Sequence, residues 1–252
     1  MIAVMAMFAW PAAASAAGGT AMTTLTPNTS SASSSASVSI TGLSGVSGLP
    51  SSIALLLQPG FSSSVMSVPV LCTAAEASSS ACPTGSQIGT ASAGVTFLGL
   101  PIKGSLTAFL GAPLDPGDVA SVILSGSLDG TKLSLSGRLF VPSQGGLELL
   151  LSGFPSEPVT LESLALTVDA VQTATQTVTE TVIKIKIVTT GKGKHKHRHK
   201  KKIRRKVEKT ITTTYSLITN PPSCSGAWTG TVTLSYSTSA DTLPLSIPCA
   251  TS

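Results

Sequence analysis

The chain has few charged residues, few aromatic residues and very few histidines. Of its 252 residues 11% are charged and 4% aromatic, whereas about a quarter of a typical globular protein is charged. All three histidines lie between His195 and His199, which leaves a Ser-His-Asp or Cys-His system elsewhere without an imidazole. The sequence contains no P-loop, G-x-G-x-x-G or H-E-x-x-H motif. We therefore expect a noncatalytic protein without a cofactor.

A pair of catalytic carboxylates is not excluded by counting residues, so a carboxylate-dependent hydrolase stays open as an alternative. The segment Asp115-Pro116-Gly117-Asp118 has the composition of a turn, however. Asp129-Gly130 lies between two alternating apolar segments and is typical of a type I′ hairpin turn. We interpret these aspartates as structural.

Small and β-branched residues dominate, and they favour short strands joined by tight turns. Apolar and polar residues alternate in segments that are predicted to be strands: 36–43, 52–58, 64–72, 119–142 as a hairpin, 146–154, 159–169, 226–236 and 243–249. Gly126 and Gly137, inside the hairpin, indicate bulges or close packing. The pattern predicts an all-β fold, an antiparallel β-sandwich that is immunoglobulin-like or related, with a body formed by residues 37–168 and 215–252.

The N-terminus indicates export. An apolar segment, Ile2–Trp10, precedes an A-x-A site at Ala14–Ala16, so residues 1–16 are predicted to be a signal peptide. An apolar N-terminal strand or helix is the alternative. Residues 17–36 are rich in Ser, Thr and Ala and are predicted to be flexible. We expect a secreted or cell-surface protein.

Four cysteines agree with export, because disulfides persist in oxidising compartments. Of the three possible connectivities we favour Cys72–Cys82 with Cys224–Cys249, and four unpaired thiols are the alternative. No C-x-x-C occurs, which argues against a zinc ribbon. Trp228 is expected to pack against the second bridge, and a solvent-facing carbohydrate platform is the alternative.

Positive charge is concentrated in one segment. Residues Lys184–Lys209 hold 13 of the 16 Lys and Arg residues and one acid, and the rest of the chain is mildly acidic. Ile183, Ile185 and Ile187 alternate with Lys184 and Lys186, and Ile203, Val207 and Ile211 are evenly spaced. We predict an inserted hairpin arm at 169–214 with a basic tip at 191–206, which must lean on the body or stay partly disordered because isolated hairpins are marginal. A short helix within 200–209 is the alternative.

The basic tip is a candidate site for a polyanion, with the residues Lys192, Lys194, Lys196, Arg198, Lys200, Lys201, Lys202, Arg204, Arg205 and Lys206. The partner would be an anionic envelope polymer, an acidic polysaccharide or an anionic lipid surface. The tip has no aromatic residue to stack on bases, so sequence-specific nucleic-acid recognition is not expected. Two alternatives are a tip that only keeps a surface or adhesive module soluble, and a patch without function.

Three histidines at alternate positions, His195, His197 and His199, would share one face of a strand and are weak candidates for a metal site. The lysines and arginines between them would repel a cation. We therefore predict no bound metal.

Several motifs carry a resemblance. The segments "CPTGSQIGTASA", "SGFPSEPVTLESLALTV" and "NPPSCSGAWTG", followed by a late cysteine, resemble uncharacterised secreted β-rich cell-envelope proteins of high-GC actinobacteria, with the pattern C-P-x-x-S-x-I-G-x-A, P-x-x-P-V and N-P-x-x-C. The resemblance covers about Val38–Cys249 without the basic segment. It implies an envelope-facing β protein with extracellular disulfides, and it carries over no catalytic residues. About 45 residues between "LALTV" and "LITNPPSC" depart from the pattern.

Overall fold

The computed structural model describes residues 19–43, 48–63, 65, 70–155, 159–169, 172–190 and 197–250. The predicted signal peptide therefore lies outside the described residues. The strands of the body are β1 (Thr20–Thr26), β2 (Ser35–Thr41), β3 (Ser52–Leu57), β4 (Gln87–Phe97), β5 (Leu100–Gly111), β6 (Asp118–Leu128), β7 (Thr131–Phe140), β8 (Leu147–Ser152), β9 (Val159–Val168), β12 (Ala227–Ser235) and β13 (Ala240–Pro248). Helix α1 (Ala74–Ser78) and the 3-10 turn η2 (Thr84–Ser86) precede β4.

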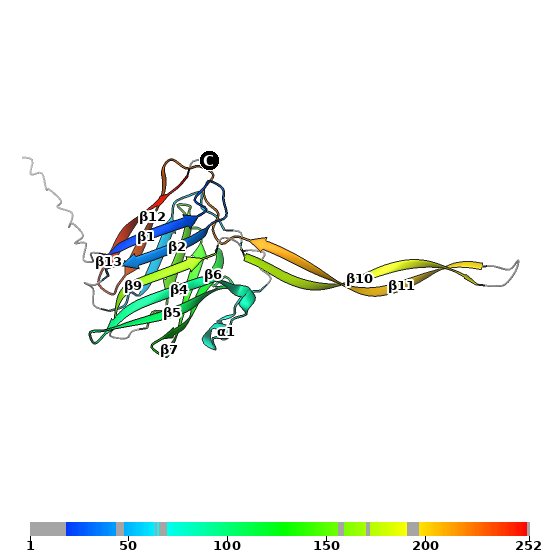
Figure 1. Ribbon diagram of the computed structural model, residues 1–252, viewed down its shortest axis with the longest axis horizontal. Helices are drawn as coiled ribbons and strands as arrows, with labels where there is room; N and C mark the ends of the chain where they lie inside the picture. The colour runs from blue at the N-terminus through cyan, green and yellow to red at the C-terminus, as the bar shows by residue number, and fades with distance from the viewer. Residues whose placement is uncertain are drawn as a thin grey trace, which may run out of the picture.

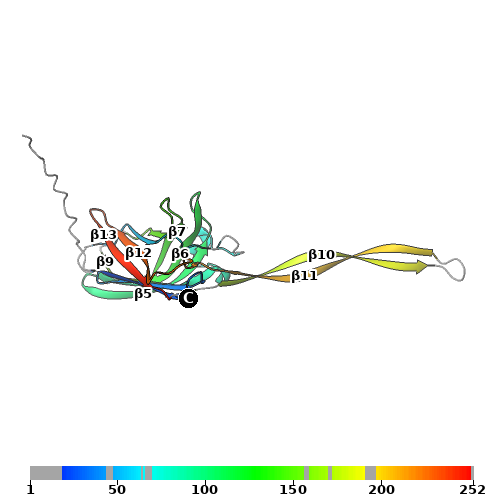
Figure 2. The same cartoon turned by 90° about the horizontal axis from the view of Figure 1, so that it is seen from above.

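These eleven strands form one antiparallel sheet in the order β1-β2-β9-β4-β5-β6-β7-β8-β3-β12-β13. The sheet curls until its two edge strands, β1 and β13, lie in contact, and Thr29 bridges Ala250 just beyond them. Figures 1 and 2 show the nearly closed, barrel-like body that results. The all-β antiparallel prediction is confirmed, but a nearly closed sheet rather than a clear sandwich is observed. Strands alternate inward and outward in both architectures, so the residue pattern does not distinguish them.

The core fills the inside of this sheet with aliphatic side chains. Strand β13 alternates exposed and buried along its whole length, and β2 follows the same period. Leu124 from β6, Leu234 from β12 and Ile247 from β13 are fully buried within one large cluster. Burying each such side chain contributes roughly 1.5–3 kcal/mol before the entropy of ordering is counted.

Strand β1 corrects the prediction of a flexible segment at 17–36. It pairs with β2 from Thr20–Thr41 to Thr26–Ser35, and it buries Thr23 and Leu25. Threonine favours strands because it is β-branched, and a neighbouring edge gives it a ladder of hydrogen bonds. The Ser/Thr-rich composition of this segment led to a prediction of flexibility, and β1 was therefore not predicted.

The hairpin predicted around Asp129-Gly130 is confirmed. Leu128 pairs with Thr131, and both turn residues have the positive φ of a type I′ turn, 48° and 79°. The pairing of β6 with β7 runs without a register shift past Gly126 and Gly137. A Cβ on Gly126 would collide with the carbonyl oxygen of Ser105, so close packing explains the glycine rather than a bulge.

Both predicted disulfides are confirmed, Cys72–Cys82 and Cys224–Cys249. Two disulfides point to an oxidising, extracellular environment. The first closes a loop that contains α1, whose capping box joins Thr73 and Glu76. The T-x-x-E pattern at Thr73 signals this helix in the sequence. The strand predicted at 64–72 falls mostly outside the described residues, and Cys72 forms an isolated bridge to Gly111.

Candidate functional site

The basic segment lies on a separate two-stranded sheet. Strands β10 (Gln172–Thr190) and β11 (His197–Tyr215) pair antiparallel over their whole length, from Gln172–Tyr215 to Thr190–His197. This confirms the predicted pairing of the two limbs and excludes the helical alternative for 200–209. The ribbon, called the arm below, projects away from the body rather than lying on it (Figures 1 and 2).

The residues that join the arm to the body are Asp169 before β10 and Leu217, Ile218 and Thr219 after β11. They are called the root below and are held by burial and by backbone hydrogen bonds. Directly after β11, Leu217 and Ile218 are buried in the core. The amide of Ser34 donates to the Ile218 carbonyl at 3.0 Å, and Thr219 exchanges two backbone hydrogen bonds with Ser62. On the other side, the amide of Asp169 donates to the Ile88 carbonyl at 2.9 Å. The body therefore fixes where the arm begins and ends.

The predicted polyanion site is only partly described. Lys192, Lys194, Lys196 and His195 lie outside the described residues, and Arg198, His197 and His199 are described through their backbone in β11. The described cations of the site are all exposed: Lys200, Lys201, Lys202, Arg204, Arg205 and Lys206. Sequence reasoning confined the site to the tip and missed three further exposed cations on the arm: Lys184, Lys186 and Lys209. Two patterns in the sequence point to these residues. Lys184 and Lys186 alternate with isoleucines, and Lys209 lies three residues after the basic tip.

The strand geometry sorts these cations into rows. Alternate residues of a strand share a face and repeat about every 6.6–6.8 Å. Lys200, Lys202, Arg204 and Lys206 of β11 therefore form one row. Lys201, Arg205 and Lys209 form the row on the opposite face, joined there by Lys184 and Lys186 of β10. Each face of the arm presents an ordered line of positive charge.

Few acids balance this charge. Glu180 and Glu208 are the acids of β10 and β11. Among the described side chains, the ion pairs all belong to Arg138 on the body, so no described arm cation is neutralised by a described carboxylate. The charge is available to an external anion.

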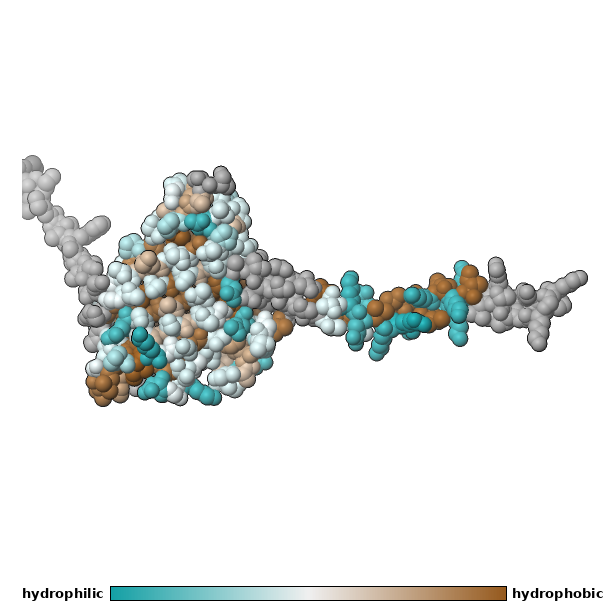
Figure 3. Space-filling view, viewed as in Figure 1, coloured by the Kyte–Doolittle hydropathy of each residue, from teal (hydrophilic) through white to brown (hydrophobic). Residues whose placement is uncertain are grey.

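Aliphatic side chains lie beside the cations. Seven of the ten pairs from Val178–Lys209 to Ile187–Lys200 set an aliphatic residue opposite a charged one. Because directly opposite residues share a face, neither face of the arm is apolar throughout. Figure 3 shows hydrophobic and hydrophilic atoms side by side along the arm.

The histidine cluster is not completed by the structure. His197 and His199 are alternate residues of β11 that are described through their backbone, and His195 lies outside the described residues. Within the described residues no group of three His, Cys, Asp or Glu side chains could hold a metal ion.

The Asp115–Asp118 segment is a turn held by an ion pair. The Arg138 guanidinium binds the Asp118 carboxylate through Nε and Nη2 at 3.0 and 2.8 Å, and its Nη1 lies 2.9 Å from Asp115. Asp118 also accepts the backbone amide of Asp115. The hydrogen bond from Arg138 is the largest of the contacts that hold the pKa of Asp118 below its usual value. Burial acts in the opposite direction and raises this pKa. Both carboxylates are committed to the turn.

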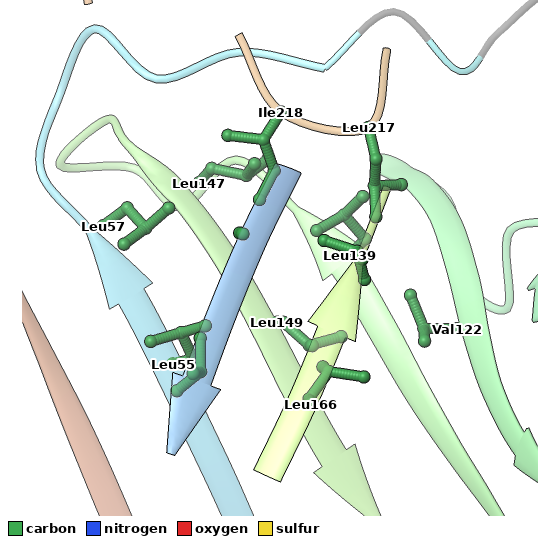
Figure 4. A pocket seen from close by; sticks show the side chains of 12 residues that line it. Leu55, Leu57, Val122, Leu139, Leu147, Leu149, Leu166, Leu217 and Ile218 are labelled. Atoms are coloured by element: carbon green, nitrogen blue, oxygen red, sulfur yellow. The ribbon is translucent and has the colours of Figure 1, made fainter. Parts of the chain in front are cut away.

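Two of the hollows in the body lie at the arm's root and on an outer face of the sheet. One is an internal cavity of about 40 Å³ with an aliphatic lining, in which Leu217 and Ile218 of the arm's root face Leu139 and Leu147 (Figure 4). The other is a shallow concavity of about 440 Å³ on the outer face of β9, β4, β5 and β6. Its floor includes a row of directly opposed hydroxyls, Thr90, Thr107 and Ser125, which sequence reasoning did not single out.

Trp228 belongs to the core. It is 1% exposed, meets the edge of Phe61 at a ring-centroid distance of 5.6 Å and donates its indole N–H to the Ser223 carbonyl at 2.8 Å. The alternative of a solvent-facing carbohydrate platform is therefore wrong. The neighbouring Cys224 packs against the same cluster.

Comparisons with protein-family models, with curated proteins and with solved structures find no match to this chain. Within the described residues, no helix has the length and apolar character needed to cross a bilayer.

Proposed function

We propose that the chain is an exported, noncatalytic protein of the cell envelope whose arm binds an anionic polymer or surface. The observation that carries the proposal is the arm itself. It is a ribbon that projects from the body and displays exposed cations in rows, with no ion pair to a described carboxylate. The two disulfides support export, since such bonds persist in oxidising compartments.

The row Lys200, Lys202, Arg204 and Lys206 suits a linear polyanion. Its charges repeat about every 6.6–6.8 Å along an extended strand. Each contact with a charged group of the polymer releases a condensed counterion, so the affinity should fall steeply with salt. An envelope phosphopolymer or an acidic polysaccharide provides the repeated charge that such a row requires.

Retention on a heparin or polyphosphate column tests the proposal. The variant K200Q/K202Q removes two charges from the arm, and K103Q/K132Q removes two exposed charges from the body. We expect the arm variant to elute at lower salt and to lower the slope of log affinity against log salt by about 1–2. The body variant should elute as the wild type does. Equal shifts in both variants would contradict the proposal, and so would a wild type that binds neither the column nor an anionic surface at low salt.

A structural role for the basic residues is the second candidate. The arm's two strands pair only with each other among the described elements, so each has an outer edge without a ladder partner. Lysine on an edge discourages pairing with other chains. If this role is the whole function, K200Q/K202Q should aggregate at a lower protein concentration while its retention on the column equals that of the wild type.

A further inference from the structure

Three isoleucines of β10 and three cations of β11 lie on the same face of the arm, where each isoleucine pairs across the strands with one cation. The pairs are Ile183–Arg204, Ile185–Lys202 and Ile187–Lys200. This set of six residues is called the isoleucine–cation face below. Its isoleucines are 52%, 59% and 59% exposed. Such exposure of three neighbouring aliphatic side chains is unfavourable in water and indicates an apolar partner.

We propose that the isoleucine–cation face binds the surface of an anionic lipid bilayer. This inference rests on the proposed function and names the anion. A hydrated polymer would neutralise Lys200, Lys202 and Arg204 but would leave the isoleucine row in water. A bilayer surface offers both chemistries within a short depth, phosphate groups outside and acyl segments about 5–10 Å below.

The geometry of the face matches that layering. Directly opposite residues have Cβ atoms about 4.5–5.5 Å apart, so the row of aliphatic side chains runs beside the row of cations. Lys and Arg have long aliphatic stems that keep the charged end in the headgroup layer while neighbouring side chains enter the acyl region. Each cation near an anionic membrane strengthens binding about fivefold, so the row acts collectively.

The position of the arm allows this contact. It extends beyond the body, so the ribbon can lie along a surface while the body stays beside it (Figure 2). The backbone of a two-stranded ribbon has unpaired polar groups at its edges, and the hydrated headgroup layer satisfies them whereas the acyl centre would not. The face therefore fits a shallow, interfacial position.

Co-sedimentation of the full chain with phosphatidylcholine vesicles, with and without 30% phosphatidylglycerol as a probe, tests the proposal. We expect binding to the anionic vesicles and at most weak binding to the neutral ones. The variant I183T/I185T/I187T keeps β-branched residues in β10 but removes the apolar row. It should bind anionic vesicles roughly 10- to 100-fold more weakly and be retained on polyphosphate as the wild type is. The matched control L100T/L114T/V141T changes three exposed aliphatic residues of the body and should bind vesicles normally.

A fluorescence measurement gives an independent readout. In the variant I185W, the new indole should show a blue-shifted emission and quenching by brominated lipids only with anionic vesicles. If I183T/I185T/I187T binds anionic vesicles as tightly as the wild type, or if the wild type binds polyphosphate but not vesicles, the lipid inference is overturned and the proposed function stands. If the wild type binds neither polymer nor vesicles, the proposed function fails as well. Equal binding to neutral and anionic vesicles would overturn the role of the cations.

Discussion

Ile185 of β10 lies directly opposite Lys202 of β11, on one face of the two-stranded arm. This register puts Ile183, Ile185 and Ile187 on the face opposite to that of Ile203, Val207 and Ile211, because the two sets have the same parity and the pairing joins odd to even positions. The aliphatic side chains of the two strands therefore do not form one apolar face. Each face combines aliphatic and cationic side chains, which is the combination that a charged, partly apolar surface requires.

The register can be tested by cross-linking. In the variant I185C/K202C the two thiols should form a disulfide under mild oxidation, because opposite residues have Cα atoms about 4.5–5.5 Å apart, within the range of a disulfide. The matched variant I185C/I203C places its cysteines on opposite faces and should stay reduced. A gel-shift assay with a thiol reagent measures both. Faster cross-linking of I185C/I203C would show that the strands are paired one residue out of the observed register.

The arm should contribute little to the stability of the body. Its strands pair with each other and not with the eleven-stranded sheet, so replacing 172–215 by two glycines should change the free energy of unfolding by less than about 1 kcal/mol, or roughly 2–4 °C in Tm. By contrast, Leu217→Ala at the buried root should cost about 2–5 kcal/mol. Thermal unfolding followed by circular dichroism compares the two. A large loss of Tm in the deletion variant would show that the arm is part of the cooperative unit.

Each disulfide should stabilise the protein by about 3 kcal/mol in the loop-entropy model, since each closes a loop of moderate length. Replacing Cys224 and Cys249 together by alanine should lower the urea midpoint and raise the m-value slightly, because the unfolded chain without the cross-link exposes more surface. The same double replacement at Cys72 and Cys82 is expected to have an effect of similar size. An unchanged midpoint in either variant would mean that strain in the folded state offsets the entropic gain.

Stability at low pH should depend on the Asp118–Arg138 pair. The folded-state pKa of Asp118 is depressed, mainly by the Arg138 hydrogen bond, so its contribution is complete above the unfolded pKa of about 3.9. That contribution is lost as the pH falls through the lower, folded-state pKa. Asp118→Asn and Arg138→Gln should both show a shallower loss of the urea midpoint below pH 4 than the wild type. Acid slopes that match the wild type in both variants would exclude this pair as a source of the pH dependence.

Much of the fold follows from local patterns. The hairpin at Asp129-Gly130 needs only a turn that accepts positive φ and alternating residues on each side, so it was predictable. Strand β1 was not, because its Thr-rich sequence gains order by pairing with β2 in three dimensions. Closure of the sheet also escaped prediction, since contact between β1 and β13 depends on how twist and curvature accumulate over eleven strands.

The sequence also predicts one part of the candidate site, and strand pairing decides the rest. The clustering of Lys and Arg in one segment is a property of composition and is visible without a structure. The contribution of Lys184, Lys186 and Lys209 to the same surface depends on the pairing of β10 with β11. The pairing of Ile185 with Lys202 depends on the strand register. A slip of one residue would place Ile185 beside a different residue of β11, on the other face.

The sequence by itself determined the β character of the chain and the separation of a basic segment from a mildly acidic body. These properties depend on residue type and on neighbours in the chain. Tertiary structure alone decided that the body is one nearly closed sheet that includes β1, that the cysteines pair as they do, and that isoleucines and cations share a face of the arm. The physical reason is that burial and cross-strand contact join residues far apart in the sequence. Alternation within one strand does not determine which residues of the partner strand lie on the same face.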